Sequence, residues 1–350
     1  MKAKTRELAK HYTMIGEELK RGVVIPFLGA GVNLCGFPRS DRSEDADLWQ
    51  RNGWLPNGPE LSQYLAKRFH YDDPATESDL LRVTQFTSVM DGLGPLYDEL
   101  HELFTRDYPI TALHKLLAEV PRKLRRKGYS VGLPLIVTTN YDEVLEEAFA
   151  AADEPFDLVA YFLDRDGHRG KFWHLPLASE YFKARIKAGA GGESAAVPWQ
   201  VIAEPNKYKD LPVRKRTIIL KIHGAVDRMN REYSSFVITE DDYIDYLARM
   251  DLANPLPKML QMLMKYSRFL FLGYGLRDWN LRVVLARIWG EQPQKYRSWA
   301  VQMDTTEIDQ RSWDRRTVDI LDQSLEDYVP SLKEAIGSIP RAPGAPSAKL

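Results

Sequence analysis

The chain has 350 residues, enough to bury a large core in one large domain or two modest ones. Its formal net charge of −1 gives no electrostatic reason to expect nucleic acid or an anionic membrane as a partner, and no apolar run approaches the roughly 20 residues of a transmembrane helix. Its one cysteine, Cys35, excludes a disulfide framework and a zinc site built from four cysteines, and it fits a reducing cytoplasm.

The first predicted strand is Val23–Leu28, which follows an amphipathic helix over residues 6–20 and runs into the glycine turn Gly29-Ala30-Gly31. In α/β proteins, such a strand and turn bring backbone N–H groups close to a phosphate. The glycine spacing matches neither the dinucleotide fingerprint nor the P-loop, so a tight turn without a ligand is the alternative. Pro26 predicts that this strand is bulged or ends early, because proline lacks the N–H of a ladder bond.

Three stretches shape the predicted domain organisation. Residues 34–59 are rich in Gly, Pro, Asp and Arg and predict a long loop beside the glycine turn. The pattern weakens again over 155–212, which predicts a small irregular or helical insert, and the proline-rich residues 338–350 predict a disordered tail. We therefore expect one catalytic domain over residues 1–337 that contains the insert.

Three later predicted strands also end in polar or glycine motifs. Residues 133–139 run into Thr139-Asn140-Tyr141-Asp142, residues 217–222 into His223-Gly224, and residues 269–272 into Gly273-Tyr274-Gly275. Alternation of strands with helices predicts a Rossmann-like, doubly wound parallel α/β sheet, in which ligands bind beyond the carboxyl ends of the strands. The four motifs are therefore expected to meet at one edge of the sheet.

The residue types in these motifs suit a phosphate-bearing ligand. Glycines allow close approach, Asn140 offers a donor and an acceptor, Asp142 offers an acceptor, and His223 can take up a proton near neutral pH. Each polar residue also has a structural reading. Asn140 or Asp142 could cap the following helix, and His223 could be a buried histidine bonded to backbone.

Four segments of the chain, in this order, resemble motifs of the sirtuin family. Gly29-Ala30-Gly31-Val32-Asn33 resembles GAG[IV]S, residues 36–40 look like a shortened GIPDFRS, residues 139–142 resemble QNID, and Ile222-His223-Gly224 matches the catalytic HG. The match is closer to the bacterial sirtuin-like branch, in which TTNYD, KIHG and F-x-G-Y-G-x-x-D-x-N recur in NAD-consuming defence proteins. The resemblance covers roughly residues 20–305.

The resemblance implies an NAD glycohydrolase that converts NAD and water into nicotinamide and ADP-ribose, as an abortive-infection effector against phage. Deacylating sirtuins carry a CxxC…CxxC zinc ribbon, and a chain with Cys35 alone lacks it, so we expect a metal-free protein. Asn33 also replaces the usual Ser, and residues 273–276 replace the adenosine-side GTSL. A zinc-free deacylase or ADP-ribosyltransferase, or a catalytically silent sensor of NAD or ADP-ribose, are the alternatives.

The resemblance also implies roles for single residues. His223 would be the general base on a ribose hydroxyl or water, Asn140 would orient the water or the carboxamide, and Asp142 would bind the carboxamide or the ribose. Arg39 would neutralise phosphate or close the loop. The residues expected to contact NAD are Gly29, Ala30, Gly31, Val32, Asn33, Phe37, Arg39, Thr139, Gly273, Tyr274, Gly275, Asp278 and Asn280.

Unregulated loss of NAD would kill the host, so an inactive state is expected. No segment of the chain resembles a receptor for nucleic acid or phage protein, which places sensing in self-assembly or in a separate subunit. We expect a homo-oligomer that docks on a partner such as a HerA-type ATPase or a short Argonaute. The 34–59 loop would then gate access to NAD.

Overall fold

A nine-stranded sheet forms the centre of the part of the chain that the structure, a computed structural model, describes. The described residues are 2–37, 49–50, 53–130, 132–188, 199–252, 256–275, 283, 285 and 296–345. The strands are β1 (Val24–Leu28), β2 (Leu135–Thr138), β3 (Phe156–Arg165), β4 (His168–Leu175), β5 (Gln200–Val201), β6 (Thr217–Lys221), β9 (Arg268–Leu272), β10 (Ser298–Val301) and β11 (Val318–Leu321).

The strand order is β11-β10-β9-β1-β2-β6-β3-β4-β5, and every pairing from β11 to β3 is parallel. Only β4 runs antiparallel to its neighbours β3 and β5. The predicted Rossmann-like parallel α/β sheet is confirmed. The chain builds β2, β3 and β6 on one side of β1 and then crosses to β9 on the other side, so the carboxyl ends of β1 and β9 flank a topological switch point.

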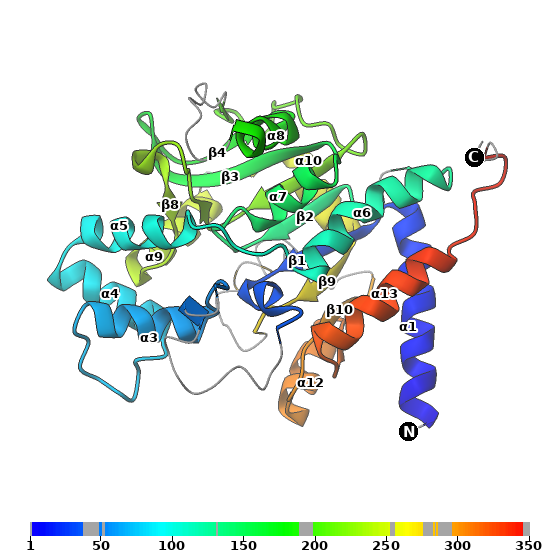
Figure 1. The fold of residues 1–350 in the computed structure, drawn as a ribbon, viewed down its shortest axis with the longest axis horizontal. Coiled ribbons are helices and arrows are strands. Elements are labelled where there is room, and N and C mark those ends of the chain that lie inside the picture. The colour runs from blue at the N-terminus through cyan, green and yellow to red at the C-terminus, as the bar shows by residue number, and fades with distance from the viewer. Residues whose placement is uncertain are drawn as a thin grey trace.

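Helices cover both faces of this sheet (Figure 1). They are α1 (Lys2–Arg21), η1 (Ala30–Leu34), α3 (Gly58–Arg68), α4 (Leu80–Met90), α5 (Leu93–Phe104), α6 (Ala112–Arg126), α7 (Val144–Ala151), α8 (Ala178–Ala188), α9 (Glu240–Leu252), α10 (Lys258–Tyr266), α12 (Glu307–Asp314) and α13 (Leu325–Ser338). A short hairpin of β7 (Gly224–Ala225) and β8 (Ser235–Phe236), which encloses η4 (Arg231–Tyr233), follows β6. No described helix has the length and apolar character needed to cross a membrane.

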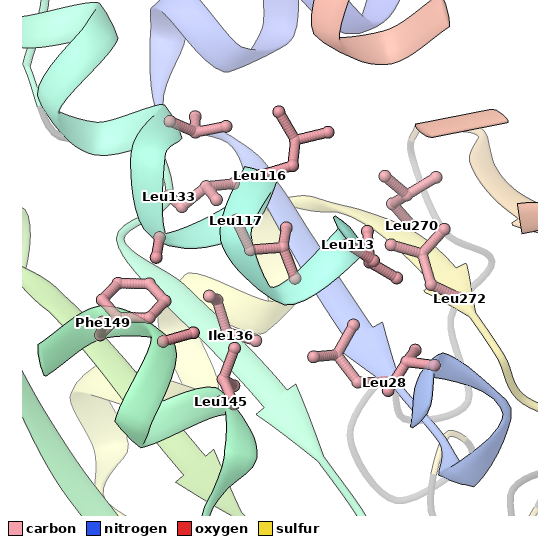
Figure 2. Close-up of a cluster of buried hydrophobic side chains, with 14 of the residues drawn as sticks. Leu28, Leu113, Leu116, Leu117, Leu133, Ile136, Leu145, Phe149, Leu270 and Leu272 are labelled. Atoms are coloured by element: carbon pink, nitrogen blue, oxygen red, sulfur yellow. The ribbon is translucent and has the colours of Figure 1, made fainter. Parts of the chain in front are cut away.

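The strands bury side chains on both faces, which is why they appear in the sequence as continuous apolar runs. One face packs against α1, α6, α7, α8 and α13, and Figure 2 shows part of this cluster, with Leu28 and Ile136 below the leucines of α6 and Leu270 beside them. The other face, which includes Phe27, Val137 and Leu220, packs against α10 and α12. A third cluster holds α3, α4 and α5 together beside the sheet.

Pro26 lies inside β1 without a bulge or an early end, so that expectation is wrong. Val24 to Leu28 all pair in register with β9, where Pro26 stands opposite Leu270. The Leu28 carbonyl accepts from the Thr139 amide after β2, and the Gly29 amide donates to the Leu272 carbonyl of β9. The backbone N–H and C=O groups of even-numbered residues of β1 therefore point toward β2, and those of odd-numbered residues point toward β9. Pairing with β2 begins only at Phe27, so the missing N–H of Pro26 falls where β2 does not require it.

Residues 155–212 do not form an irregular insert in their described part, which corrects the expectation for this stretch. β3 pairs in parallel with β6, and β4 pairs with β3, so both belong to the central sheet. The fully buried carboxylate of Asp157 links this region to the central sheet. The carboxylate accepts hydrogen bonds from Arg216, just before β6, and lies 2.8 Å from Nε2 of His174 on β4. β3 is apolar on both faces, so it shows no alternation of polar and apolar residues.

The predicted disorder of the tail is wrong for residues 338–345, and residues 346–350 lie outside the described part. The Lys127 ammonium at the end of α6 donates to the carbonyls of Gly337 and Ile339, at 2.6 and 2.5 Å. The amide of Ala342 donates back to the Lys127 carbonyl at 2.8 Å. This segment therefore continues α13 across the end of α6.

Candidate functional site

A cavity of about 460 Å³ lies at the carboxyl ends of β1, β2, β6 and β9, where the sequence predicts a site. Its volume is in the usual range for pockets that bind small molecules. The sheet contributes the residues after these strands, and helices supply the facing wall. The wall residues are Pro56, Asn57, Gly58, Pro59, Leu61, Leu80, Phe104 and Tyr243.

Most of the predicted site residues line this cavity: Gly29, Ala30, Gly31, Asn33, Thr139, Asn140, Asp142, His223, Gly273, Tyr274 and Gly275. Val32 instead lies fully buried in the core. Phe37 belongs to the cluster of α3, α4 and α5, where its ring centroid lies 4.8 Å from that of Trp54. Arg39, Asp278 and Asn280 lie outside the described residues, as does half of the predicted gating loop, so these predictions stay untested.

The glycines after β1 and β9 allow the two turns to pack directly against each other. The Gly31 amide donates to the Gly273 carbonyl at 2.9 Å, and a Cβ on Gly31 would lie 2.8 Å from that oxygen. Gly273 has φ of +64°, and its own Cβ would lie 2.3 Å from the Val32 nitrogen. The amides of Gly29 and Val32 also donate to backbone carbonyls, those of Leu272 and Gly29, so three candidate phosphate donors are already bound to backbone.

Asn33 and Asp142 form a buried pair on the cavity wall. The Asn33 amide nitrogen donates to Oδ2 of Asp142 at 3.1 Å, and Oδ1 of Asp142 accepts from the Val144 amide at the start of α7. The N-cap of α7 is Glu143, so Asp142 is not the cap residue, although its carboxylate binds the first amide of the helix. Because the carboxylate fixes which way the Asn33 amide turns, its Oδ1 faces away from Asp142 and has no hydrogen-bond partner among the described residues.

His223 follows β6 and is only 2% exposed. Its Nδ1 lies 3.2 Å from the hydroxyl oxygen of Tyr243, while Nε2 is buried with no partner in the described part of the chain. Burial lowers the pKa of the imidazole to about 3, so the ring is neutral at physiological pH. The site thus presents a neutral histidine with one uncommitted nitrogen.

Asn140 spans the ends of β1 and β2. Its side-chain nitrogen donates to the Gly29 carbonyl at 3.4 Å, and its backbone amide donates to the Thr138 hydroxyl at 3.0 Å. None of its described hydrogen bonds goes to α7, so the capping alternative does not apply to Asn140. The side chain is half-buried on the cavity wall.

A buried ion pair supports the loop after β2. The Lys221 ammonium donates to the Asp142 carbonyl and to Oε1 of Glu146, the latter at 2.9 Å, and both side chains are 1% exposed. Lys221 thereby joins the end of β6 to the loop that carries Asn140 and Asp142. Among the described residues, no group of three or more His, Cys, Asp or Glu side chains is placed to hold a metal ion.

Residues 56–59 of the helical wall belong to the 34–59 loop predicted to lie beside the glycine turn, whereas the sequence does not predict the rest of the wall. Asn57 begins α3 with a capping box, in which its side chain accepts from the Glu60 amide and the Glu60 carboxylate accepts from the Asn57 amide. The Asn-x-x-Glu spacing signals that helix start. Tyr243 on α9 carries no signal that separates it from an ordinary core tyrosine.

Fold and site together define a Rossmann-like α/β protein with a cavity at its topological switch point. The model of the SIR2-like domain matches residues 134–321, more than half of the chain, and the chain belongs to this family. The sirtuin-like resemblance is thereby confirmed.

Two curated relatives are similar over much of this chain. Defense-associated sirtuin 2 of Bacillus subtilis is 23% identical over 273 residues, which are 77% of this chain and 20% of that protein. NAD(+) hydrolase ThsA of Bacillus cereus (strain MSX-D12) is 23% identical over 218 residues, 62% of this chain and 33% of that protein. The chain therefore spans a fifth to a third of the length of these relatives.

Proposed function

We propose that the protein is an NAD glycohydrolase of anti-phage defence. The observation that carries this proposal is a pair of buried polar atoms, His223 Nε2 and Asn33 Oδ1, on residues that line one cavity and without partners among the described residues. A buried polar atom left unpaired costs about 1–3 kcal/mol, so such a pair favours a polar ligand. The names of the two relatives, a defense-associated sirtuin and an NAD(+) hydrolase, support NAD as that ligand.

Cleavage of the N-glycosidic bond of NAD builds positive charge on the ribose carbon while nicotinamide leaves as a neutral molecule. The leaving group needs no proton, so the useful catalyst is a base. The neutral His223 imidazole can accept a proton from a ribose hydroxyl or from the attacking water, and Asn140 can orient that water or the carboxamide. Burial of His223 Nε2 strengthens its hydrogen bond to a ligand, because the local dielectric constant is low.

The test is incubation of the purified chain with NAD and chromatography of nicotinamide and ADP-ribose. His223→Ala and Asn140→Ala should each lower NAD loss at least about 100-fold, the low end of general-base effects, with little change in stability. His168→Ala and Asn206→Ala are matched controls, since both residues are exposed and lie outside the cavity. Near-normal turnover in a cavity variant would remove that residue from the mechanism.

Other products would identify a different activity. Acetyl-ADP-ribose from an acetylated peptide would identify a deacylase, and ADP-ribose attached to an acceptor protein would identify a transferase. NAD binding without turnover, under every activating condition, would identify a sensor.

We also propose that assembly or a partner activates the protein. For this chain, we propose a homo-oligomer that docks on a separate subunit such as a HerA-type ATPase or a short Argonaute. Light scattering combined with the NAD assay should show a multimer of weak activity that gains activity with its partner. A monomer with full activity in dilute solution would refute this regulation and leave the site assignment intact.

A further inference from the structure

We propose that Tyr243 is a positioning residue that fixes the tautomer of His223. In this arrangement Nδ1–H of the imidazole donates to the Tyr243 hydroxyl oxygen, and the lone pair of Nε2 faces the cavity as the proton acceptor. The proposal deepens the proposed function, since it rests on His223 acting as the base.

The position of Tyr243 is fixed by the start of α9. Its amide donates to the Thr239 carbonyl at 3.1 Å, within the first turn of the helix. That turn is closed by a reciprocal pair: the Asp242 amide donates to the Thr239 hydroxyl and the Thr239 amide donates to the Asp242 carboxylate, at 3.1 and 3.0 Å. Tyr243 therefore approaches His223 from a rigid helix end.

The backbone of His223 is fixed as well. Its carbonyl accepts from the Val237 amide at 2.8 Å, in the short segment that leads from β8 into α9. The imidazole and the Tyr243 ring meet edge to face, with centroids 5.2 Å apart and planes at 83°. Both partners are thus held from the same connecting segment, so the 3.2 Å separation of Nδ1 and Oη is a property of the fold.

A neutral imidazole carries one N–H and one lone pair, and the hydrogen bond at one nitrogen decides which the other presents. A base at Nε2 needs the proton on Nδ1, and a buried N–H needs an acceptor. Oη of Tyr243 supplies that acceptor. When Nε2 takes a proton, the same bond becomes charge-assisted and stabilises the imidazolium.

Tyr246 provides a matched control from the next turn of α9. Its ring also meets His223 edge to face, with centroids 5.7 Å apart and the same 83° between planes. Its buried hydroxyl has no hydrogen-bond partner among the described residues. Tyr243→Phe and Tyr246→Phe therefore each remove one hydroxyl from a ring packed on the same imidazole, and only the first removes a bond to it.

The experiment reads the tautomer directly from nitrogen NMR of histidine-labelled full-length protein, with the His223 signal assigned by its loss in His223→Ala. Wild type and Tyr246→Phe should show a protonated Nδ1 and a bare Nε2, and Tyr243→Phe should lose that pattern. A wild-type ring protonated at Nε2, or a Tyr243→Phe ring that keeps the wild-type tautomer, would overturn the proposal.

The kinetic arm uses the same variants. Tyr243→Phe should lower kcat for NAD about 10-fold or more, with KM within about twofold, and Tyr246→Phe should match wild type in both. An unchanged kcat in Tyr243→Phe would overturn the catalytic part of the proposal. If the wild-type protein cleaves no NAD, the proposed function fails, whereas the NMR result still decides whether Tyr243 sets the tautomer.

Discussion

Gly273→Ala should destabilise the protein strongly, because the turn after β9 admits no Cβ at this position. Gly273 has φ of +64°, and the added Cβ would lie 2.3 Å from the Val32 nitrogen and 2.6 Å from the Gly31 carbonyl carbon. Both atoms are backbone, so a side-chain rotation cannot relieve the overlap. A left-handed conformation costs a residue with a Cβ about 1–2 kcal/mol, and overpacking typically adds about 1–3 kcal/mol. We expect the free energy of unfolding to fall by about 2–5 kcal/mol.

Urea unfolding of Gly273→Ala and Gly275→Ala measures this effect within one turn. A Cβ on Gly275 meets no heavy atom within 4 Å among the described residues, and its φ is outside the left-handed region. Gly275→Ala should therefore change the free energy of unfolding by no more than about 0.5 kcal/mol. If the two variants unfold at the same urea concentration, the close packing of the turns after β1 and β9 is not what requires glycine at 273.

Two further predictions concern buried charge. Lys221→Met leaves the Glu146 carboxylate buried and unpaired, so it should lower the free energy of unfolding by about 3–5 kcal/mol. Combining Lys221→Met with Glu146→Leu should recover most of that loss. A double variant that is no more stable in urea than Lys221→Met alone would contradict this. Burial lowers the pKa of His114 to about 4, below the value of 6.5 in the unfolded chain. As the pH falls, the unfolded state therefore takes up the proton first. This residue should lower the free energy of unfolding by about 2 kcal/mol between pH 7 and pH 5. Comparing the wild type with His114→Gln at both pH values isolates this term from groups of opposite sign, such as Glu143, whose pKa burial raises to about 7; equal losses in the two proteins would refute it.

The sequence predicts the central strands well because their burial and their ends act together. β1, β2, β6 and β9 are short, mainly apolar runs, each followed within two residues by glycine or a polar residue. Since parallel strands end at one edge, four local signals predict a single cavity. β3 also runs into polar residues and a glycine, Asp166-Gly167, but these form the turn into β4 and do not line the cavity, and its buried Asp157 depends on His174 and Arg216 elsewhere in the chain. The local sequence therefore does not indicate that β3 belongs to the central sheet.

Within the site, the sequence predicts which residues line the cavity better than it predicts the contacts that each residue makes. His223 and Asn140 do line the cavity, as expected from their places after β6 and β2. The glycine turn was expected to give its amides to a ligand, but Gly31 donates to Gly273, a residue more than two hundred positions away. Tyr243 could not be predicted at all, because only the folded chain brings α9 to His223.

The segment between β8 and α9 joins the two walls of the cavity. The Val237 amide donates to the His223 carbonyl, and the Val237 carbonyl accepts from the Tyr141 hydroxyl at 2.8 Å. Two hydrogen bonds therefore join this segment to the residues that follow β6 and β2. The Thr84 hydroxyl of α4 donates to the Ile238 carbonyl at 2.9 Å, and the Tyr97 hydroxyl of α5 donates to Phe236 at 3.1 Å. Because these bonds engage successive backbone groups, α4 and α5 cannot shift without moving the segment that positions both His223 and the start of α9. The helical wall thus helps to hold the proposed base in place.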